Sequence, residues 1–195
     1  MGGRPPVHAS SITASHYALD SHAVLKREPG RVHLDGFLSY STAVYTVPYG
    51  VIVPKEIDNL LLPVPVSGSH IGFSTLRMEP CWMALGEAAG IASALAIDKQ
   101  LKMRNVPIDE LQEQLINQKA TLLYYKDVEY TNPEFKMVQK LGVKGYLPEC
   151  EARLQDPIDK ETLSEWKRLS NLKLDGVAVD KTTRLATLRI IFQSL

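Results

Sequence analysis

VPYGVIVPKEIDNLLLPVPVSGSHIGFSTLRMEPCWMALGEAAGIASALAIDK, residues 47–99, is the stretch that decides the fold of this 195-residue chain. Its apolar run at Asn59–Val66 lies between turn residues and ends in prolines, which predicts a short buried strand. After a Gly/Ser loop that carries a histidine, Glu79 and Pro80 mark the start of a helix. Proline is tolerated in the first helical turn, and a carboxylate there favours the helix dipole. No further proline appears before Pro107, so the predicted helix runs to about residue 99.

The predicted helix carries small residues along one face. Gly86, Gly90 and Ala94 recur every four residues, so their backbone can lie close to a sheet or to a flat ligand. Each glycine inside a helix costs about 1 kcal/mol relative to alanine. We therefore expect close packing against this face to offset that cost.

Three motifs follow one another within residues 48–96: PYGVIVPKEIDNLL at 48–61, SGSH at 67–70 with LRMEP at 76–80, and MALGEAAGIASALA at 83–96. In this order they resemble the C-terminal part of the FAD-dependent oxidoreductases of the glutathione-reductase-like flavoprotein superfamily. The Pro63-Val64 pair is similar to a branch of that family that often carries the label xanthan lyase. The resemblance implies FAD as the cofactor and hydride transfer between the flavin and a substrate.

The resemblance also implies a place for the cofactor. In such flavoproteins the strand and the helix complete the FAD-binding domain, and the helix N-terminus points toward the pyrimidine edge of the isoalloxazine ring. Unpaired N–H groups at a helix N-terminus favour the negative charge of a reduced flavin. The implied cofactor-binding residues are Arg77, Pro80, Trp82 and Met83 along that edge, with Ser69 and His70 on the adjoining loop. Two alternatives stand open, an ion pair of Arg77 with Glu79 or Glu87 and a core position for Trp82.

The superfamily holds the ADP half of FAD with a strand, a G-x-G-x-x-G turn and a helix. None of the twelve glycines here forms that motif, so the chain resembles the last portion of a longer flavoenzyme. The face left by the missing half should be exposed or buried by self-association. Two alternatives remain, a non-catalytic remnant or interaction module, and a polysaccharide (xanthan) lyase that uses Tyr17 or Tyr49 with a histidine. The residues assign no catalytic group for the redox chemistry.

Charge and composition exclude several classes of partner. Twenty-two basic and twenty-two acidic residues cancel, which argues against binding to nucleic acid or to an anionic membrane. Cys81 and Cys150 form no disulfide framework or zinc motif. No apolar run approaches the length of a membrane span. We expect a soluble chain, cytoplasmic as written or periplasmic or extracellular within a longer parent, with a small molecule or a saccharide as substrate.

Residues 1–46 alternate polar and apolar side chains at Val32–Leu38 and Ala43–Val47, which predicts strands of the substrate-side sheet of the flavoprotein fold. The same region holds a polar cluster made of His16, Asp20 and His22, with His33 and Asp35 nearby. Their spacing fits no metal motif, so we predict no metal site and interpret them as hydrogen-bonded surface or substrate-cleft residues.

The chain divides at 123/124. Residues 1–123 resemble the flavoprotein and end with an amphipathic helix at Ile108–Ile116. Residues 124–195 resemble one S-layer-homology repeat in which Lys160-Glu161 replaces a Thr-Arg pair, which favours a structural helical module over cell-wall binding. Helices are predicted there at Phe135–Leu141, Asp159–Leu169 and Thr182–Phe192. The fold class expected for the whole chain is α+β.

Overall fold

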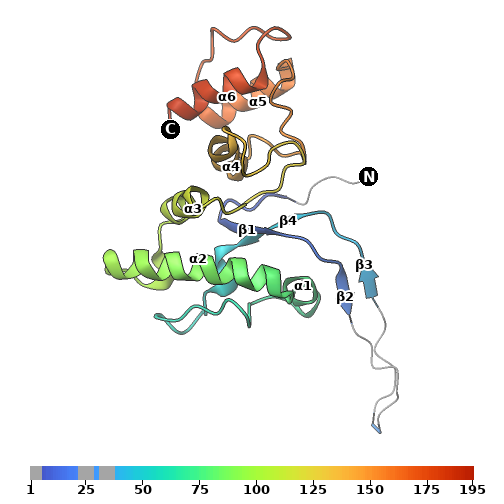
Figure 1. Ribbon diagram of the computed structural model, residues 1–195, viewed down its shortest axis with the longest axis vertical. Coiled ribbons are helices and arrows are strands. Elements are labelled where there is room, and N and C mark those ends of the chain that lie inside the picture. Colours follow the sequence, from blue (N-terminus) through green and yellow to red (C-terminus); the bar gives the residue numbers. More distant parts are fainter. Residues whose placement is uncertain (1–5, 22–28, 31–37) are drawn as a thin grey trace.

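The computed structural model describes residues 6–21, 29–30 and 38–195. Within them the protein combines two small sheets with six α-helices, in agreement with the α+β prediction. In chain order the elements are β1 (Ser11–Ser15), β2 (Leu19–Ser21), β3 (Leu38–Tyr40), β4 (Tyr45–Pro48), α1 (His70–Leu76), α2 (Glu79–Asp98), α3 (Ile108–Asn117), α4 (Phe135–Val143), α5 (Lys160–Ser170) and α6 (Arg184–Gln193). Helices α4 to α6 stack beyond α3, on the far side of the chain from α1 (Figure 1).

The first sheet is an antiparallel pair of β1 and β4, and the second pairs β2 with β3. The alternation at Ala43–Val47 correctly predicts β4, while Val32–Leu38 lies mostly outside the described residues. Ile12 of β1 and Val47 of β4 are each 1% exposed and belong to the core next to α2. The short N-terminal strands therefore form one wall of that core.

Helix α2 confirms the prediction made from Glu79 and Pro80. One face is buried, and it packs against β1 and α3 through Leu85, Ala88, Ala92 and Leu95. The opposite face is also apolar but exposed, with Met83 at 76% and Ile97 at 72% exposure. Contrary to the expectation that no apolar run approaches the length of a membrane span, α2 is long and apolar enough to cross a membrane by length and composition, although a single such helix is weak evidence for a span.

The strand expected before α1 is wrong. The run at Asn59–Val66 is irregular and forms no strand. Two backbone hydrogen bonds join this run and the residue after it to the short helical turn that precedes them. Leu62 N donates to Ile52 O at 2.8 Å, and Ser67 N donates to Val51 O at 2.7 Å. Proline lacks the N–H that a ladder needs, and an apolar pattern makes a strand only where a neighbouring strand can pair with it. The glycine face is open, as expected for a face whose partner belongs to the missing half, because outside the helix's own backbone no described atom lies within 4 Å of a Cβ placed at Gly86 or Gly90.

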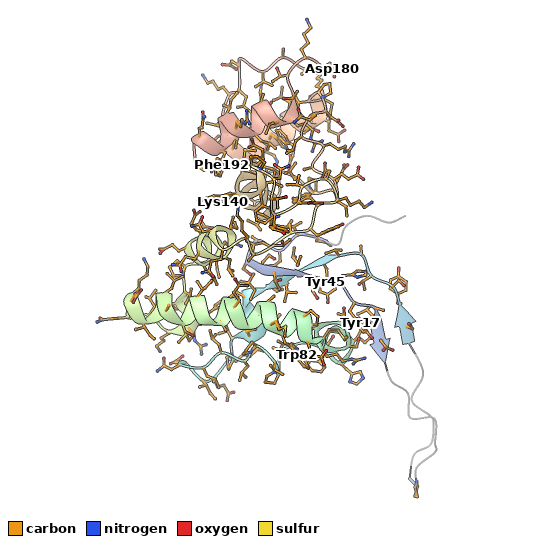
Figure 2. The ribbon with its side chains drawn as sticks, viewed as in Figure 1. Tyr17, Tyr45, Trp82, Lys140, Asp180 and Phe192 are labelled. Carbon is orange, nitrogen blue, oxygen red and sulfur yellow. The ribbon has the colours of Figure 1, made fainter. Side chains whose placement is uncertain are left out.

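The predicted helices beyond residue 107 are confirmed as α3, α4, α5 and α6. Asp159 caps α5 by accepting a hydrogen bond from Thr162 N at 2.8 Å. Between α4 and α6, the Nζ of Lys140 lies 5.8 Å from the centre of the Phe192 ring (Figure 2). The buried side chains of the C-terminal helices belong to the same hydrophobic core cluster as those of β1, β4 and α2.

Tyr49 makes the N-terminal core sensitive to alkali. It is 4% exposed, its hydroxyl donates to Met103 O at 2.7 Å, and burial raises its pKa to about 12. Because the folded pKa exceeds the unfolded value of 10.0, stability that is present below pH 10 is lost as the pH rises to about 12. We expect Tyr49→Phe to lower stability by about 1 kcal/mol at neutral pH, through the lost hydrogen bond, and to lose less stability above pH 10. Urea unfolding at several pH values measures both effects, and equal alkaline slopes would refute the assignment.

Candidate functional site

The corner between α1 and α2 holds most of the residues that the sequence singles out. Helix α1 begins after Ser69, whose Oγ accepts a hydrogen bond from Gly72 N at 3.0 Å. It ends at Arg77, and Met78 then turns the chain into α2. The corner is short because the RMEP sequence places a proline in the first turn of the new helix.

Arg77 is held on the N-terminal segment. Its guanidinium pairs with the carboxylate of Asp20 at 3.1 Å, and its central carbon lies 5.7 Å from the centre of the Tyr17 ring. Both charged side chains are largely buried, with 29% and 18% exposure, so the pair is stronger than an exposed one. Spacing along the sequence, which suggested Glu79 or Glu87, does not reveal this partner.

Hydrogen bonds from α1 fix the same N-terminal segment. Thr75 Oγ1 donates to Tyr17 O at 2.6 Å, and Asp20 N donates to Ser74 Oγ at 3.1 Å. The Tyr45 hydroxyl lies 2.7 Å from Thr75 Oγ1. Tyr17, Tyr45 and Trp82 all lie around this corner (Figure 2). The corner is therefore a fixed platform, which suits the orientation of a bound ring.

The two ionisable side chains behind this platform, Tyr45 and Cys81, stay neutral. Burial raises the pKa of the Tyr45 hydroxyl above its usual value of 10.0. Burial likewise raises the pKa of the Cys81 thiol above 9.0, so this cysteine is not an activated nucleophile. Neither residue supplies acid–base chemistry near neutral pH.

The N-terminus of α2 presents unused donors. Met78 occupies the N-cap position and makes no side-chain cap, and Glu79 and Pro80 are exposed. One turn in, the Nε1 of Trp82 is buried, and none of the described residues accepts its hydrogen bond. A buried N–H without an acceptor costs about 1–3 kcal/mol, so such a group usually marks a bound partner or water. This corner is suited to an electron-rich acceptor edge.

The structure brings together four of the six predicted cofactor residues. Arg77, Pro80, Trp82 and Met83 belong to the corner and the first turn of α2. Ser69 and His70 are exposed at the opposite end of α1, seven residues away, which corresponds to about 10 Å along a helix. Ser69 is occupied as the cap of α1.

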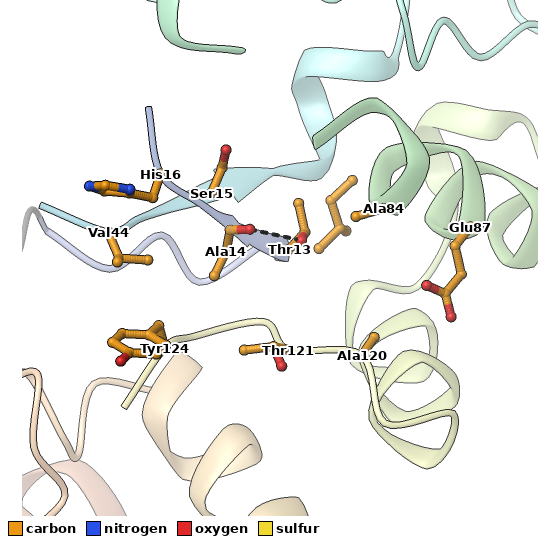
Figure 3. A pocket seen from close by; sticks show the side chains of 11 residues that line it. Thr13, Ala14, Ser15, His16, Val44, Ala84, Glu87, Ala120, Thr121 and Tyr124 are labelled. Atoms are coloured by element: carbon orange, nitrogen blue, oxygen red, sulfur yellow. Dashed lines mark hydrogen bonds between the residues drawn. The ribbon is translucent and has the colours of Figure 1, made fainter. Parts of the chain in front are cut away.

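A cleft of about 600 Å³ lies beside α2 and contains residues that sequence reasoning missed. Its walls are β1 with His16, the first half of α2 at Ala84 and Glu87, and the segment from Ala120 to Tyr124 (Figure 3). That segment follows the edge of β1 that β4 leaves open, because Ala14 N donates to Thr121 O at 2.9 Å. No local signal predicts this cleft, since its three walls lie far apart in the sequence.

Polar groups stand at the ends of the cleft. His16 and Tyr124 lie at one end and Glu87 at the other, with mostly small or apolar side chains between them (Figure 3). An apolar cleft with a few polar groups is typical of sites for small organic ligands. The arrangement can orient a substrate through hydrogen bonds.

The polar cluster predicted near the N-terminus does not assemble a metal site among the described residues. No group of three or more His, Cys, Asp and Glu side chains in them could hold a metal ion. Asp20 pairs with Arg77, and exposed His16 lines the cleft. His22, His33 and Asp35 lie outside the described residues.

In the comparison with known protein families, one family matches the chain. The family described as FAD dependent oxidoreductase matches residues 4–115, which include β1 to β4, α1, α2 and most of α3. No curated protein and no solved structure matches the chain. The match covers the α1–α2 corner and most of the cleft beside it and stops before α4.

Proposed function

This chain belongs to the family of FAD-dependent oxidoreductases, and from that premise we propose that it is the C-terminal portion of a flavoenzyme. In this proposal the α1–α2 corner covers the pyrimidine edge of the isoalloxazine ring. The ADP half of FAD would be held by a dinucleotide-binding part that carries the G-x-G-x-x-G motif. The chain would not catalyse the reaction without that part.

The orphaned Nε1 of Trp82 is the observation that carries the proposal. The uncapped N-terminus of α2 adds backbone donors at the same corner, where the guanidinium of Arg77 is paired with Asp20 and the carboxylate of Glu79 is exposed. The pyrimidine edge of a flavin presents carbonyl oxygens and ring nitrogen, which are acceptors that gain negative charge on reduction. The residues therefore fit the cofactor that the family uses.

Each predicted residue has a role in this proposal. Trp82 would donate a hydrogen bond to the flavin edge, Arg77, paired with Asp20, would hold the N-terminal segment at the corner, and Pro80 and Met83 would pack against the ring. Ser69 orders the start of α1, and His70 extends the site toward the adjoining loop. FAD, when bound, supplies the hydride or electron transfer, while these residues orient it and exclude water.

We further propose that the cleft beside α2 receives the substrate, a small molecule or a saccharide. His16 and Tyr124 would contact its polar groups, and Glu87 would mark the other end. The exposed face of α2, from Met83 to Ile97, would be the surface that meets the dinucleotide-binding part or a second copy.

The alternatives are less well supported. For the xanthan lyase label, Tyr49 would have to act as a base, but its buried hydroxyl donates to Met103 O. Tyr17 lies against Arg77 and the α1–α2 corner. The S-layer-homology resemblance of residues 124–195 has only the helical order of α4 to α6 in its favour. A non-catalytic remnant or interaction module stays as the second candidate, because the α2 face is exposed and apolar.

Replacing Trp82 tests the proposed function. Trp82→Phe keeps the aromatic bulk but removes the indole donor, so we expect the Kd for FAD to rise about fivefold, the equivalent of one neutral hydrogen bond. Quenching of flavin fluorescence on titration of FAD with the purified chain measures this affinity.

Tyr130→Phe is the matched control for this substitution. This change also removes the polar group of an aromatic ring, but Tyr130 is 60% exposed and lies in the C-terminal part. The FAD affinity of Tyr130→Phe should therefore equal that of the wild type. Equal FAD affinities for wild type and Trp82→Phe would contradict the proposal.

A further inference from the structure

The C-terminal helices enclose a second cleft, of about 500 Å³, which the family match does not reach. It lies between the turn after α4, the first two turns of α5 and the start of α6. The residues used below are Glu149, Arg153, Glu161, Glu165, Trp166 and Arg184. Its volume is in the range of about 300–1,000 Å³ that small-molecule sites occupy.

Arg184 is the unusual residue of this cleft. It is the first residue of α6, is 8% exposed, and its guanidinium carbon lies 5.5 Å from the centre of the Trp166 ring. Its Nε is buried and finds no acceptor in the part of the chain that the structure describes. Within those same residues, none of the hydrogen bonds or ion pairs involves its guanidinium.

The position of Arg184 does little to stabilise the fold. A cation in the first turn of a helix opposes the helix dipole. Taking a charged guanidinium out of water without a hydrogen-bonded partner is unfavourable, and the contact with Trp166 offsets only part of that cost. The carboxylates of Asp159, Asp156 and Asp127 act on this charge electrostatically but accept no hydrogen bond from the guanidinium, so an acceptor within the cleft would satisfy the unused donors.

Most of the other charged groups of the cleft already have a partner in the chain. Arg153 pairs with Glu149, and Glu165 accepts hydrogen bonds from Arg168, which lies outside the cleft. Asp159 at the cleft wall is used as the cap of α5. Arg184 is thus the cation available to a ligand among the described residues of this cleft.

We propose that this cleft binds a hydroxylated monocarboxylate of the size of a sugar acid, with its carboxylate on Arg184. The planar guanidinium matches a planar carboxylate through two parallel hydrogen bonds. The exposed carboxylates of Glu149, Glu161 and Glu165 can accept hydrogen bonds from hydroxyl groups, and they repel a ligand with further negative charge. This chemistry favours one carboxylate over a phosphate or sulfate dianion.

Gluconate is the probe, and Trp166 is the reporter. The chain has two tryptophans, so Trp82→Phe leaves Trp166 as the sole emitter, in contact with the binding group. In that background we expect gluconate to change the emission saturably with a Kd of about 1 mM. Glucose, which lacks the carboxylate, should leave the emission unchanged, and sulfate should bind at least about tenfold more weakly.

Two substitutions of Arg184 separate binding from folding. Arg184→Met keeps the packing volume and removes the charge, so gluconate affinity should fall at least about tenfold while the melting temperature stays equal or rises. Arg184→Lys keeps the positive charge but loses the planar pair of donors that the guanidinium presents, so it should also weaken gluconate binding. This variant provides a second test if the methionine variant does not fold. Arg189→Met, at an exposed arginine of α6 that pairs with Glu134 outside the cleft, is the matched control and should bind as the parent does.

Three results would overturn the proposal. They are an emission that does not saturate up to about 20 mM gluconate, full affinity in Arg184→Met, and sulfate binding as tightly as gluconate. A fall in melting temperature in Arg184→Met without any gluconate binding by the parent would show that the arginine is structural. Because the probe and reporter lie outside the α1–α2 corner, the outcome is independent of FAD binding.

Discussion

Gln139→Leu is expected to lower the free energy of unfolding by about 3 kcal/mol, because it leaves three buried backbone groups without partners. Gln139 of α4 is fully buried. Its Oε1 accepts hydrogen bonds from Leu122 N and Leu123 N, both at 2.8 Å, and its Nε2 donates to Leu123 O at 2.7 Å. Leucine fills the same space but satisfies none of these groups. Urea denaturation followed by circular dichroism measures the change.

The same residue tests how the two portions of the chain fold. Leu122 and Leu123 end the portion assigned to 1–123, and Gln139 belongs to the portion assigned to 124–195. We propose that both portions unfold in a single transition, since this buried contact joins them. Gln114→Leu, at an exposed position of α3, is the control and should change stability by less than about 0.5 kcal/mol. A Gln139→Leu variant as stable as this control would refute the importance of the contact.

Gly142→Ala is expected to destabilise the protein by about 2 kcal/mol, although alanine is the better helix former. A Cβ at this position of α4 would overlap the Tyr125 hydroxyl and lie 3.3 Å from its ring carbon Cζ. Tyr125 cannot move aside easily, because it is 2% exposed and its hydroxyl donates to Leu147 O at 2.9 Å. Thermal or urea unfolding of the single variant gives the cost.

A double-mutant cycle identifies the cause of that cost. In a Tyr125→Phe background the overlapping oxygen is gone, so Gly142→Ala should cost less than about 1 kcal/mol. Gly90→Ala is the matched control, because a Cβ there meets no described atom within 4 Å and the helix gains up to about 1 kcal/mol. An equal cost of Gly142→Ala with and without the Tyr125 hydroxyl would contradict the steric explanation.

Local signals predict most of the helices. Pro80 with Glu79 predicts α2, and Asp159 predicts the cap of α5, because each acts within one turn of its own chain. The run at Asn59–Val66 fails as a strand for the opposite reason, since a strand depends on a partner elsewhere. The exposed glycine face of α2 shows the same limit, because close packing needs a second surface.

The candidate sites depend still more on tertiary contacts. The corner residues Arg77 and Trp82 can be named from motifs, but the pairing of Arg77 with Asp20 spans 57 positions in sequence. The cleft beside α2 joins segments near residues 14, 84 and 121, and no periodicity connects them. Arg184 looks like an ordinary helix residue until its burial and missing acceptors are seen.

The central claim is that Trp82 and the start of α2 recognise a flavin, and the indole N–H signals test it directly. A chain with two tryptophans gives two indole cross-peaks in a ¹H–¹⁵N spectrum, and Trp82→Phe assigns them. On titration with FAD we predict that the Trp82 signal moves as its N–H gains an acceptor. The Trp166 signal should not move, because the Trp166 N–H already donates a hydrogen bond to Tyr146 O at 2.8 Å. A Trp82 signal unmoved at saturating FAD, or shifts confined to Trp166, would contradict the account.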